Sequence, residues 1–451
     1  MSLRQAGLMQ ADSRAMRRRC ICALASTAAA SLTAPWRALA AGLSGQGNAN
    51  VVSASEELRL LGPQLVAIVR RHVNLGYTPG AVVVVARANA VEMTVVGEQA
   101  RGGAAPVRTD SIFRIASMTK PITAAAAMMF VEEGRLRLRD PIDRWIPELA
   151  NRRVLREPGA ALDDTVPARR PITLEDLLTF RCGLGIRSPQ PDTSPIQRQI
   201  DELQLVGFGP PDPASALTPD EWLKRLGTLP LMAQPGEDWL YNTGSYILGV
   251  LLARVAGASL PELLRRRVFE PLGMKATGFY VPASQLSRLV SAYRLEAGRT
   301  VLYDAPGASP WQLPPAFPDG GAGLVSTAED YLAFSRFLLT GGRVVGRSLL
   351  RPATVDTMTH DRLTAKQRAA GAPILGGGRG WGFGMSVVTQ SHAAGLPSGC
   401  FGWNGGLGST WVADPRSGRS VIVLTETLFS SPTPPALHQE IWRAVFAPSV
   451  V

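Results

Sequence analysis

The sequence predicts an α+β protein in which an antiparallel β-sheet is flanked by helices and interrupted by an inserted, mostly helical lobe. Strand patterns occur near both ends of the chain, in residues 81–97 and 382–425, whereas residues 135–320 contain helix patterns, loops and many prolines. The 451 residues are 45% hydrophobic and 18% charged, which is enough apolar material for a large core. Composition therefore excludes intrinsic disorder, collagen-like repeats and coiled coil.

The first 40 residues are predicted to be a signal peptide. Three arginines at 17–19 precede a mildly apolar stretch, and Ala38-Leu39-Ala40 follows as a small-residue cleavage signal. The apolar run is too short for a transmembrane helix, and the paired arginines also fit a twin-arginine signal. A disordered tail is the alternative. We therefore expect a periplasmic or secreted protein without stable membrane insertion after cleavage.

Residues 50–451 are expected to form one catalytic domain, with a sheet lobe at about 55–115 and 325–451 and a helical lobe at about 116–324. Its first elements follow from local patterns. Apolar residues at helical spacing predict a helix over 56–74. After Pro79-Gly80, a β-branched run that turns back at 88–90 predicts a hairpin over 81–97. Residues 117–134 are predicted to be a helix that stops at Gly134.

The later elements are shorter. Proline and glycine breaks divide the middle of the chain into short helices, which are expected at 173–179, 219–227, 244–256 and 261–268. Strand patterns return in 382–389, 409–413 and 420–425, and an amphipathic helix is expected over 435–445. No internal repeat is present.

The net charge of +11 does not indicate a nucleic-acid-binding protein. Residues 1–40 carry +5 of this charge, and most remaining arginines are scattered along the chain. No two of the four histidines stand at metal-ligand spacing, so neither a metal nor another cofactor is expected. Cleavage after residue 40 would leave Cys182 and Cys400 as the thiols, and the sequence leaves their pairing open.

The most informative motif is Ser117-Met118-Thr119-Lys120. On a helix, Lys120 lies one turn after Ser117 on the same face. A serine hydroxyl needs a base to take its proton, and a lysine can be that base only where burial or a neighbouring cation keeps it neutral. Arginine cannot do this, so a lysine here is informative in a chain with 47 basic residues and only four lysines. Taken alone, the motif fits a chance helix start equally well.

Two further motifs add weaker evidence. Tyr241 precedes a predicted helix, and its hydroxyl could pass a proton to a leaving group; the alternative is a core tyrosine. In residues 401–411, glycines allow close approach of a ligand, and the N–H of Gly406 could bind an oxyanion. The chain has no G-x-S-x-G elbow, no P-loop and no dinucleotide-binding glycine motif.

Together and in this order, the three motifs resemble the serine β-lactamase-like superfamily, which includes class C β-lactamases, DD-peptidases and family VIII carboxylesterases. The likeness runs from about residue 80 to 414 and includes residues 177–184, 269–274 and 321–327. It implies a β-lactamase/transpeptidase-like fold. It also implies that Ser117 is the acylated nucleophile, Lys120 the base and Tyr241 a second acid/base, with an oxyanion hole formed by the backbone N–H groups of Ser117 and Gly406.

Two departures distinguish among these relatives. The Tyr-x-Asn motif of β-lactamases is here Tyr241-Asn242-Thr243, and Trp403-Asn404-Gly405 stands where Lys-Thr-Gly is common. β-Lactamases and DD-peptidases use that lysine to hold a substrate carboxylate, whereas an indole offers an apolar wall with one N–H donor. The family VIII esterases resemble this chain in having tryptophan there. Trp403, Asn404, Gly405 and Thr243 are therefore expected to bind the substrate.

The sequence thus favours a serine hydrolase, a carboxylesterase that cleaves neutral acyl esters through an acyl-enzyme on Ser117. The expected partner is a small-molecule ester, with no nucleic acid and no cofactor. The alternatives are a weak β-lactamase or D-amino-acid peptidase, an acyltransferase, and a non-enzymatic penicillin-recognising module. The natural substrate, the acyl length, the oligomeric state and the choice between Lys120 and Tyr241 as primary base are not set by the sequence.

Overall fold

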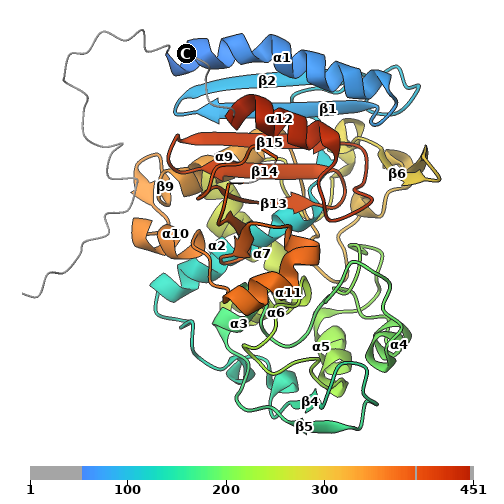
Figure 1. Ribbon diagram of the computed structural model, residues 1–451, viewed down its shortest axis with the longest axis vertical. Helices are drawn as coiled ribbons and strands as arrows, with labels where there is room; N and C mark the ends of the chain where they lie inside the picture. Colours follow the sequence, from blue (N-terminus) through green and yellow to red (C-terminus); the bar gives the residue numbers. More distant parts are fainter. Residues whose placement is uncertain (1–52, 392–393, 447–451) are drawn as a thin grey trace, which may run out of the picture.

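The computed structural model describes residues 53–391 and 394–446; the predicted signal peptide lies outside these residues. Its centre is a seven-stranded sheet in the order β11-β12-β13-β14-β15-β1-β2, in which every neighbouring pair is antiparallel (Figure 1). The strands are β1 (Gly80–Arg87), β2 (Ala90–Gly97), β11 (Arg379–Trp381), β12 (Ser386–Val388), β13 (Phe401–Gly405), β14 (Ser409–Asp414) and β15 (Arg419–Thr425).

Strand β1 connects the early strands with the late strands of the sequence. It pairs with β2 on one side and with β15 on the other. Its valine run is buried, and successive side chains enter different cores. Val82 and Val84 belong to the large core on one face of the sheet, whereas Val83 and Val85 belong to the core on the other face. Both faces of the sheet are therefore covered.

Two terminal helices cover one face. Helices α1 (Ala54–Asn74) and α12 (Ala436–Phe446) lie beside each other over the sheet (Figure 1). Leu65 of α1 and Trp442 of α12 are fully buried against β1 and β15. This layer covers the face of the sheet opposite to the one on which helix α2 (Thr119–Glu132) packs.

The other face packs on α2 (Thr119–Glu132), α9 (Ala328–Leu339) and the helices of the middle segment. These further helices are α3 (Leu174–Leu178), α4 (Pro195–Glu202), α5 (Pro219–Thr228), α6 (Thr243–Ala256), α7 (Leu260–Leu264), α8 (Glu270–Leu272), α10 (Pro352–Met358) and α11 (Ala365–Leu375). Short two-stranded sheets accompany them: β3 (Phe113–Arg114) with β8 (Val325–Ser326), β4 (Arg153–Leu155) with β5 (Thr165–Pro167), β6 (Ala292–Glu296) with β7 (Arg299–Asp304), and β9 (Arg343–Val344) with β10 (Arg347–Ser348).

The structure corrects the predicted strand over 382–389. The chain forms β11, turns, and returns as β12, and each of these strands has three residues. The turn needs Gly384 in the left-handed region, at φ 74°, and is closed by the N–H of Gly382 donating to the carbonyl of Met385 at 2.9 Å. The helical middle also contains strand pairs that the sequence did not suggest, of which the β6–β7 hairpin is the longest.

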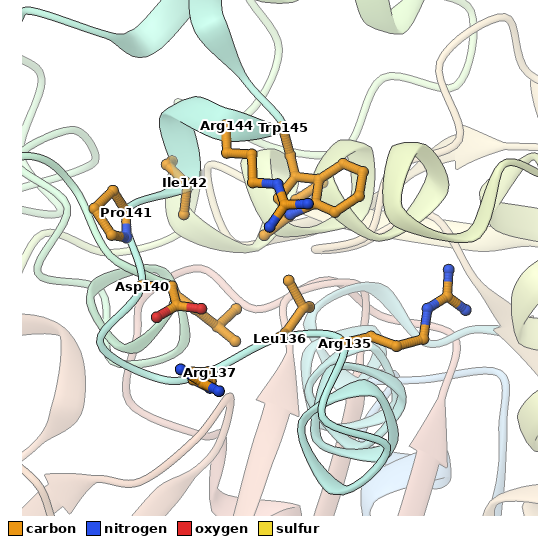
Figure 2. A pocket seen from close by; sticks show the side chains of 10 residues that line it. Arg135, Leu136, Arg137, Asp140, Pro141, Ile142, Arg144 and Trp145 are labelled. Atoms are coloured by element: carbon orange, nitrogen blue, oxygen red, sulfur yellow. The ribbon is translucent and has the colours of Figure 1, made fainter. Parts of the chain in front are cut away.

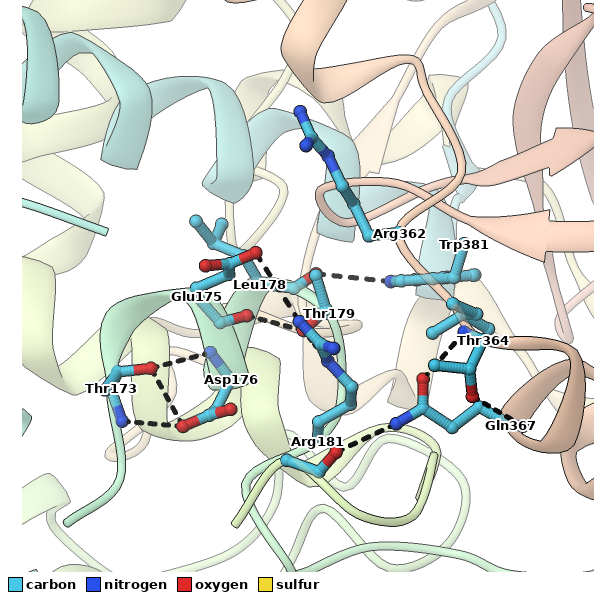
Figure 3. Close-up of polar contacts among 12 residues, drawn as sticks. Thr173, Glu175, Asp176, Leu178, Thr179, Arg181, Arg362, Thr364, Gln367 and Trp381 are labelled. Atoms are coloured by element: carbon cyan, nitrogen blue, oxygen red, sulfur yellow. Dashed lines mark hydrogen bonds and ion pairs between the residues drawn. The ribbon is translucent and has the colours of Figure 1, made fainter. Parts of the chain in front are cut away.

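Capping boxes start two helices that flank the loop leading to Tyr241 (Figure 3). Thr173 caps α3 together with Asp176, and Thr364 caps α11 together with Gln367. The Gln367 side chain also donates to the carbonyls of Gly236 and Glu237 at 2.9 and 3.0 Å. Helix α11 is thereby attached to the loop before Tyr241.

Cys182 and Cys400 are both buried free thiols. They belong to different core clusters, and burial raises the pKa of the Cys182 thiol to about 12. Among residues 53–391 and 394–446, no group of three or more His, Cys, Asp and Glu side chains could hold a metal ion. In the same residues no single helix is long and apolar enough to cross a membrane, although α6 and the segment after it pass together as a pair bent by 79°.

Candidate active site

Ser117 is presented by a strained turn between β3 and α2. A short 3₁₀ helix, Ala116–Met118, joins the two elements. Ala116 has φ 42°, a left-handed conformation that is costly for a residue with a side chain and is typical of functional sites. Ala116 and Met118 are buried while Ser117 stays partly exposed, so the turn directs the hydroxyl out of the core.

Lys120 lies on the first turn of α2 and is completely buried. Its Nζ donates to Ser117 Oγ at 2.8 Å and to the carbonyl of Gly321 at 2.8 Å. Burial lowers the pKa of this amine to about 7, and the charge of Asp319 opposes the fall. The amine is therefore poised to exchange a proton with Ser117 near neutral pH.

Tyr241 approaches the same serine from the loop before α6. Its hydroxyl donates to Ser117 Oγ at 2.8 Å and accepts from the indole N–H of Trp403 at 2.9 Å. The next residue, Asn242, has φ 87°, which turns the chain sharply into the helix. Burial raises the pKa of Tyr241 to about 12, against the lowering effect of its bonds to Ser117 and Trp403. The phenol is thus a neutral proton donor at ordinary pH.

The glycine segment after β13 completes the arrangement. Gly405 passes so close to the nucleophile turn that a Cβ on it would lie 2.2 Å from the carbonyl oxygen of Ile115. Ser409 Oγ donates to the same carbonyl at 3.1 Å. The neighbouring Gly406 is exposed, and neither its amide nor that of Ser117 donates a hydrogen bond to another described residue. Both amides are free to bind an oxyanion.

Trp403 differs from the apolar wall expected from the sequence. The side chain is only 5% exposed, and it meets Trp381 edge-on, with ring centroids 4.7 Å apart. Its N–H is used by Tyr241, so its main contacts are internal. The next residue, Asn404, is partly exposed, and its buried Oδ1 has no hydrogen-bond partner among the described residues.

The structure does not bring Thr243 to the others. It is the first residue of α6, is fully buried, and its hydroxyl donates to the carbonyl of Gly207 at 2.9 Å. A hydroxyl placed in this way holds the loop around Gly207 against the helix, because its only donor hydrogen is already used.

An aromatic cluster that the sequence did not suggest supports Tyr241 and Trp403. Phe180 stacks on Trp381 with centroids 4.8 Å apart and meets Tyr241 edge-on at 5.5 Å. The Trp381 N–H donates to the carbonyl of Leu178 at 3.2 Å (Figure 3), which fixes this ring on the end of α3. The members are far apart in the sequence and share no spacing, so no local pattern could have identified them.

Two pockets lie away from this site. The one in Figure 2 follows the C-terminal end of α2, opposite the end that carries Lys120, and its volume of about 30 Å³ suits a single water molecule. A larger pocket of about 320 Å³ is lined by Ile112 and residues such as Phe269, Tyr280 and Pro314. Neither is lined by Ser117, Lys120 or Tyr241.

The chain is similar to known proteins over most of its length. The family described as Beta-lactamase matches residues 65–446. The chain is 41% identical over 369 residues to Protein Rv1367c of Mycobacterium tuberculosis, a match that covers 80% of this chain and 88% of that protein. It is 31% identical over 386 residues to Esterase EstB of Burkholderia gladioli, covering 80% of this chain and 90% of that protein.

The fold is also found among solved structures. The solved structure of EstCE1, described as a hydrolase with promiscuous acyltransferase activity, matches with a TM-score of 0.73 at 28% identity, over 86% of this chain and 99% of that one. The α+β architecture inferred from the sequence, with its β-lactamase/transpeptidase-like fold, is confirmed. The chain therefore belongs to the Beta-lactamase family and is a serine hydrolase-type enzyme with esterase and acyltransferase homologues.

Proposed function

We propose that this protein is a carboxylesterase that hydrolyses neutral acyl esters through an acyl-enzyme on Ser117. The observation that carries the proposal is the convergence on Ser117 Oγ of two proton-transfer groups, Lys120 Nζ and Tyr241 OH, each at 2.8 Å. The names of Esterase EstB and of the hydrolase EstCE1 support an ester-cleaving activity.

Acylation begins with loss of the serine proton. Neutral Lys120 takes the proton of Ser117 while Oγ attacks the ester carbonyl, and the amides of Ser117 and Gly406 stabilise the resulting oxyanion. Tyr241 donates its phenol proton to the leaving alkoxide as the C–O bond breaks. The tyrosinate formed is stabilised by the N–H of Trp403. It then takes a proton from the Lys120 ammonium, which returns both groups to their starting protonation states.

Deacylation uses the same groups with water as nucleophile. The Tyr241–Lys120 pair accepts a proton from water as its oxygen attacks the acyl carbonyl, and Ser117 leaves with a proton returned by the same pair. We assign Lys120 as the first base because its pKa of about 7 lies near working pH, whereas the pKa of Tyr241 is about 12.

The preference for neutral substrates follows from position 403. A tryptophan whose only polar atom already donates to Tyr241 cannot hold a substrate carboxylate. Asn404, with its unpartnered Oδ1, and the exposed backbone of Gly405 and Gly406 are the groups we propose to bind the ester. β-Lactam or D-amino-acid peptide cleavage is the competing activity.

The test compares p-nitrophenyl butyrate and nitrocefin hydrolysis by the native enzyme, Ser117→Ala, and the matched exposed-site variant Ser287→Ala. We expect ester turnover to fall at least about 10³-fold in Ser117→Ala and to be unchanged in Ser287→Ala. Rapid nitrocefin cleavage would instead favour a β-lactamase. Ester turnover that persists in Ser117→Ala would refute the assignment of Ser117 as the nucleophile.

Acyl transfer is a second candidate, supported by the activity described for EstCE1. It requires an acceptor alcohol to reach the acyl-enzyme faster than water does. Adding a primary alcohol to the p-nitrophenyl butyrate assay and measuring butyrate ester against free butyrate separates the two. A product dominated by the new ester at millimolar alcohol would make the protein a transferase.

We also propose that residues 1–40 direct export and are removed. The basic, apolar and small-residue order of that segment supports this. Expression of the full chain in a bacterial host, followed by N-terminal sequencing of periplasmic and cytoplasmic fractions, would decide it. Recovery of only the uncleaved chain in the cytoplasm would contradict it.

A further inference from the structure

A turn at residues 319–324 lies against the start of the nucleophile helix and is bound to it at three places. Lys120 Nζ donates to the carbonyl of Gly321 at 2.8 Å, and Thr123 Oγ1 donates to the carbonyl of Gly320 at 2.7 Å. The N–H of Leu324 donates to Thr119 Oγ1 at 3.2 Å. One turn of α2 therefore holds this segment, and the segment in turn holds the catalytic amine.

Asp319 determines the shape of that turn. Its Oδ1 accepts from the N–H of Gly321 at 2.6 Å and from the N–H of Ala322 at 3.0 Å. The turn has no room to adjust, since a Cβ on Gly321 would lie 2.6 Å from the ring of Tyr246. The carboxylate thus fixes the peptide whose carbonyl faces Lys120.

Asp319 also acts on the amine electrostatically, because its negative charge raises the pKa of Lys120. The side chain is 7% exposed, and burial raises its pKa to about 6, against the lowering effects of Tyr246 and Lys120. The groups that face Lys120 are Ser117 on its own helix, Tyr241, whose ring centroid is 4.8 Å from Nζ, and the 319–322 turn with Tyr246 of α6 behind it. Of these, only Asp319 supplies a charge that favours the ammonium form.

We propose that Asp319 is a positioning residue for the catalytic base: it orients the carbonyl that holds Lys120, and it places a negative charge near the amine. This inference rests on the esterase function proposed above. Neither the S-x-x-K motif nor the tyrosine motif contains this residue, and its proposed effect reaches the serine through the lysine.

The decisive variant is Asp319→Asn, which keeps an oxygen acceptor for the two N–H groups and removes the charge. We expect the acid limb of the pH profile of kcat/KM to move about one pH unit to lower pH, because an anion next to an amine raises its pKa by that order. At one pH unit below the native midpoint, kcat/KM relative to its plateau then rises several-fold. Asp330→Asn is the matched control, since Asp330 is equally buried at 7% exposure and accepts from Ala276 and Thr277 away from Lys120.

A second variant tests the same mechanism if Asp319→Asn does not fold. Tyr246→Phe keeps the ring that fills the space beside Gly321 but removes the hydroxyl that helps ionise Asp319. It should move the acid limb in the same direction by a smaller amount. Folding of each variant is checked by its thermal unfolding transition.

The outcomes are distinguishable. An acid limb that stays at the native pH in both variants, with or without a lower plateau, would overturn the inference, because a purely structural role changes the plateau and leaves the midpoint. A shift of the limb in Asp330→Asn would overturn it as well. A native enzyme without ester hydrolysis, or activity that persists in Ser117→Ala, would refute the proposed function rather than the role of Asp319.

Discussion

In the proposed mechanism, Lys120 is the base that takes the proton of Ser117. Its amine is fully buried on the first turn of α2 and bonded to Ser117 Oγ and one backbone carbonyl. In water a lysine is almost entirely protonated at neutral pH and would not accept a proton. Burial lowers the pKa of Lys120, so the fold around residue 120 makes the neutral amine, the form that can accept a proton, available near pH 7.

This arrangement predicts the pH dependence of the reaction. Activity requires neutral Lys120, and a base with a lowered pKa loses its proton as pH rises. We therefore expect kcat/KM for p-nitrophenyl butyrate to increase with pH, reach half its plateau near pH 7, and stay high until the substrate itself hydrolyses. A profile that falls between pH 6 and 8 would contradict the assignment of Lys120 as base.

Replacement of the base gives a sharper prediction. Lys120→Arg keeps a positive charge but cannot accept a proton, so kcat should fall by about 10²–10⁴-fold. Lys224→Arg is the matched control on α5, where no role in the reaction is proposed. Single-turnover measurement of p-nitrophenol release would show the loss in acylation. If Lys120→Arg released p-nitrophenol in a single turnover as fast as the native enzyme does, Tyr241 would be the base instead.

The tryptophan at 403 predicts a different signature. Trp403→Phe retains an aromatic ring and removes the N–H that donates to Tyr241 at 2.9 Å. A hydrogen bond to a developing tyrosinate contributes about 1.5–3 kcal/mol, so kcat should fall about 10–100-fold, with a smaller change in KM. A change in KM alone would mean that the indole contacts substrate and does not assist Tyr241.

At the scale of single residues, the sequence indicates the catalytic candidates better than it indicates their supports. Ser117 and Lys120 are separated by one helical turn, so a local motif records their proximity. Asp319 acts on Lys120 across the fold, and no spacing within the sequence connects the two. The Gly-rich segment 321–327 was a visible signal, but only the structure shows that its carbonyl holds the amine.

Among the elements, α11 offers a local test. Thr364→Ala removes the cap of a helix whose Gln367 side chain binds the loop before Tyr241. We expect the free energy of unfolding to fall by about 1 kcal/mol, the usual cost of losing such a cap. Thr357→Ala is the matched control, because its hydroxyl bonds the carbonyl of Ala353 within α10 and caps nothing. Denaturant titration measures the free energy of unfolding of both variants. Equal values for the two would contradict the prediction.

Some elements of the fold cannot be predicted from the sequence, and the reasons are physical. Strand β13 contains Gly402 and Gly405, and glycine weakens a strand pattern even where a tightly packed sheet requires it. The β6–β7 hairpin is only partly buried, with no regular alternation of buried and exposed residues along either strand, so it gives no clear strand pattern. The helix over Ala328–Leu339 has a signal in the sequence, because Thr327 is a typical N-cap residue, and its side chain accepts from the N–H of Asp330.

For the whole molecule, the buried Glu426 predicts how stability depends on pH. This carboxyl group follows β15, is 1% exposed, and has no hydrogen-bond partner among the described residues for either oxygen. Burial raises its pKa to about 9, against the lowering effect of Arg114. The folded state therefore favours the protonated form, and stability is lost as pH rises from the unfolded value near 4.5 to about 9.

Glu426→Gln removes that dependence. The variant should be more stable than the native protein at pH 8 and closer to it at pH 5, with a flatter profile between them. Thermal or denaturant unfolding at the two pH values measures this, and the exposed Glu202→Gln serves as the matched control. Equal effects of the two substitutions, or a larger stabilisation at pH 5 than at pH 8, would refute the role of Glu426.

The pairing of β1 with β15 determines when, during synthesis of the chain, the site can be completed. At about 5–20 residues per second, synthesis takes tens of seconds to pass from Lys120 to Trp403 and Gly406, so for that time a nascent chain has its serine and lysine without the rest of the site. The lysine of such a chain is solvated and charged, and the serine beside it is inert. The complete site forms only when β13 and β15 join the sheet, so a chain that is still being synthesised lacks the proposed activity.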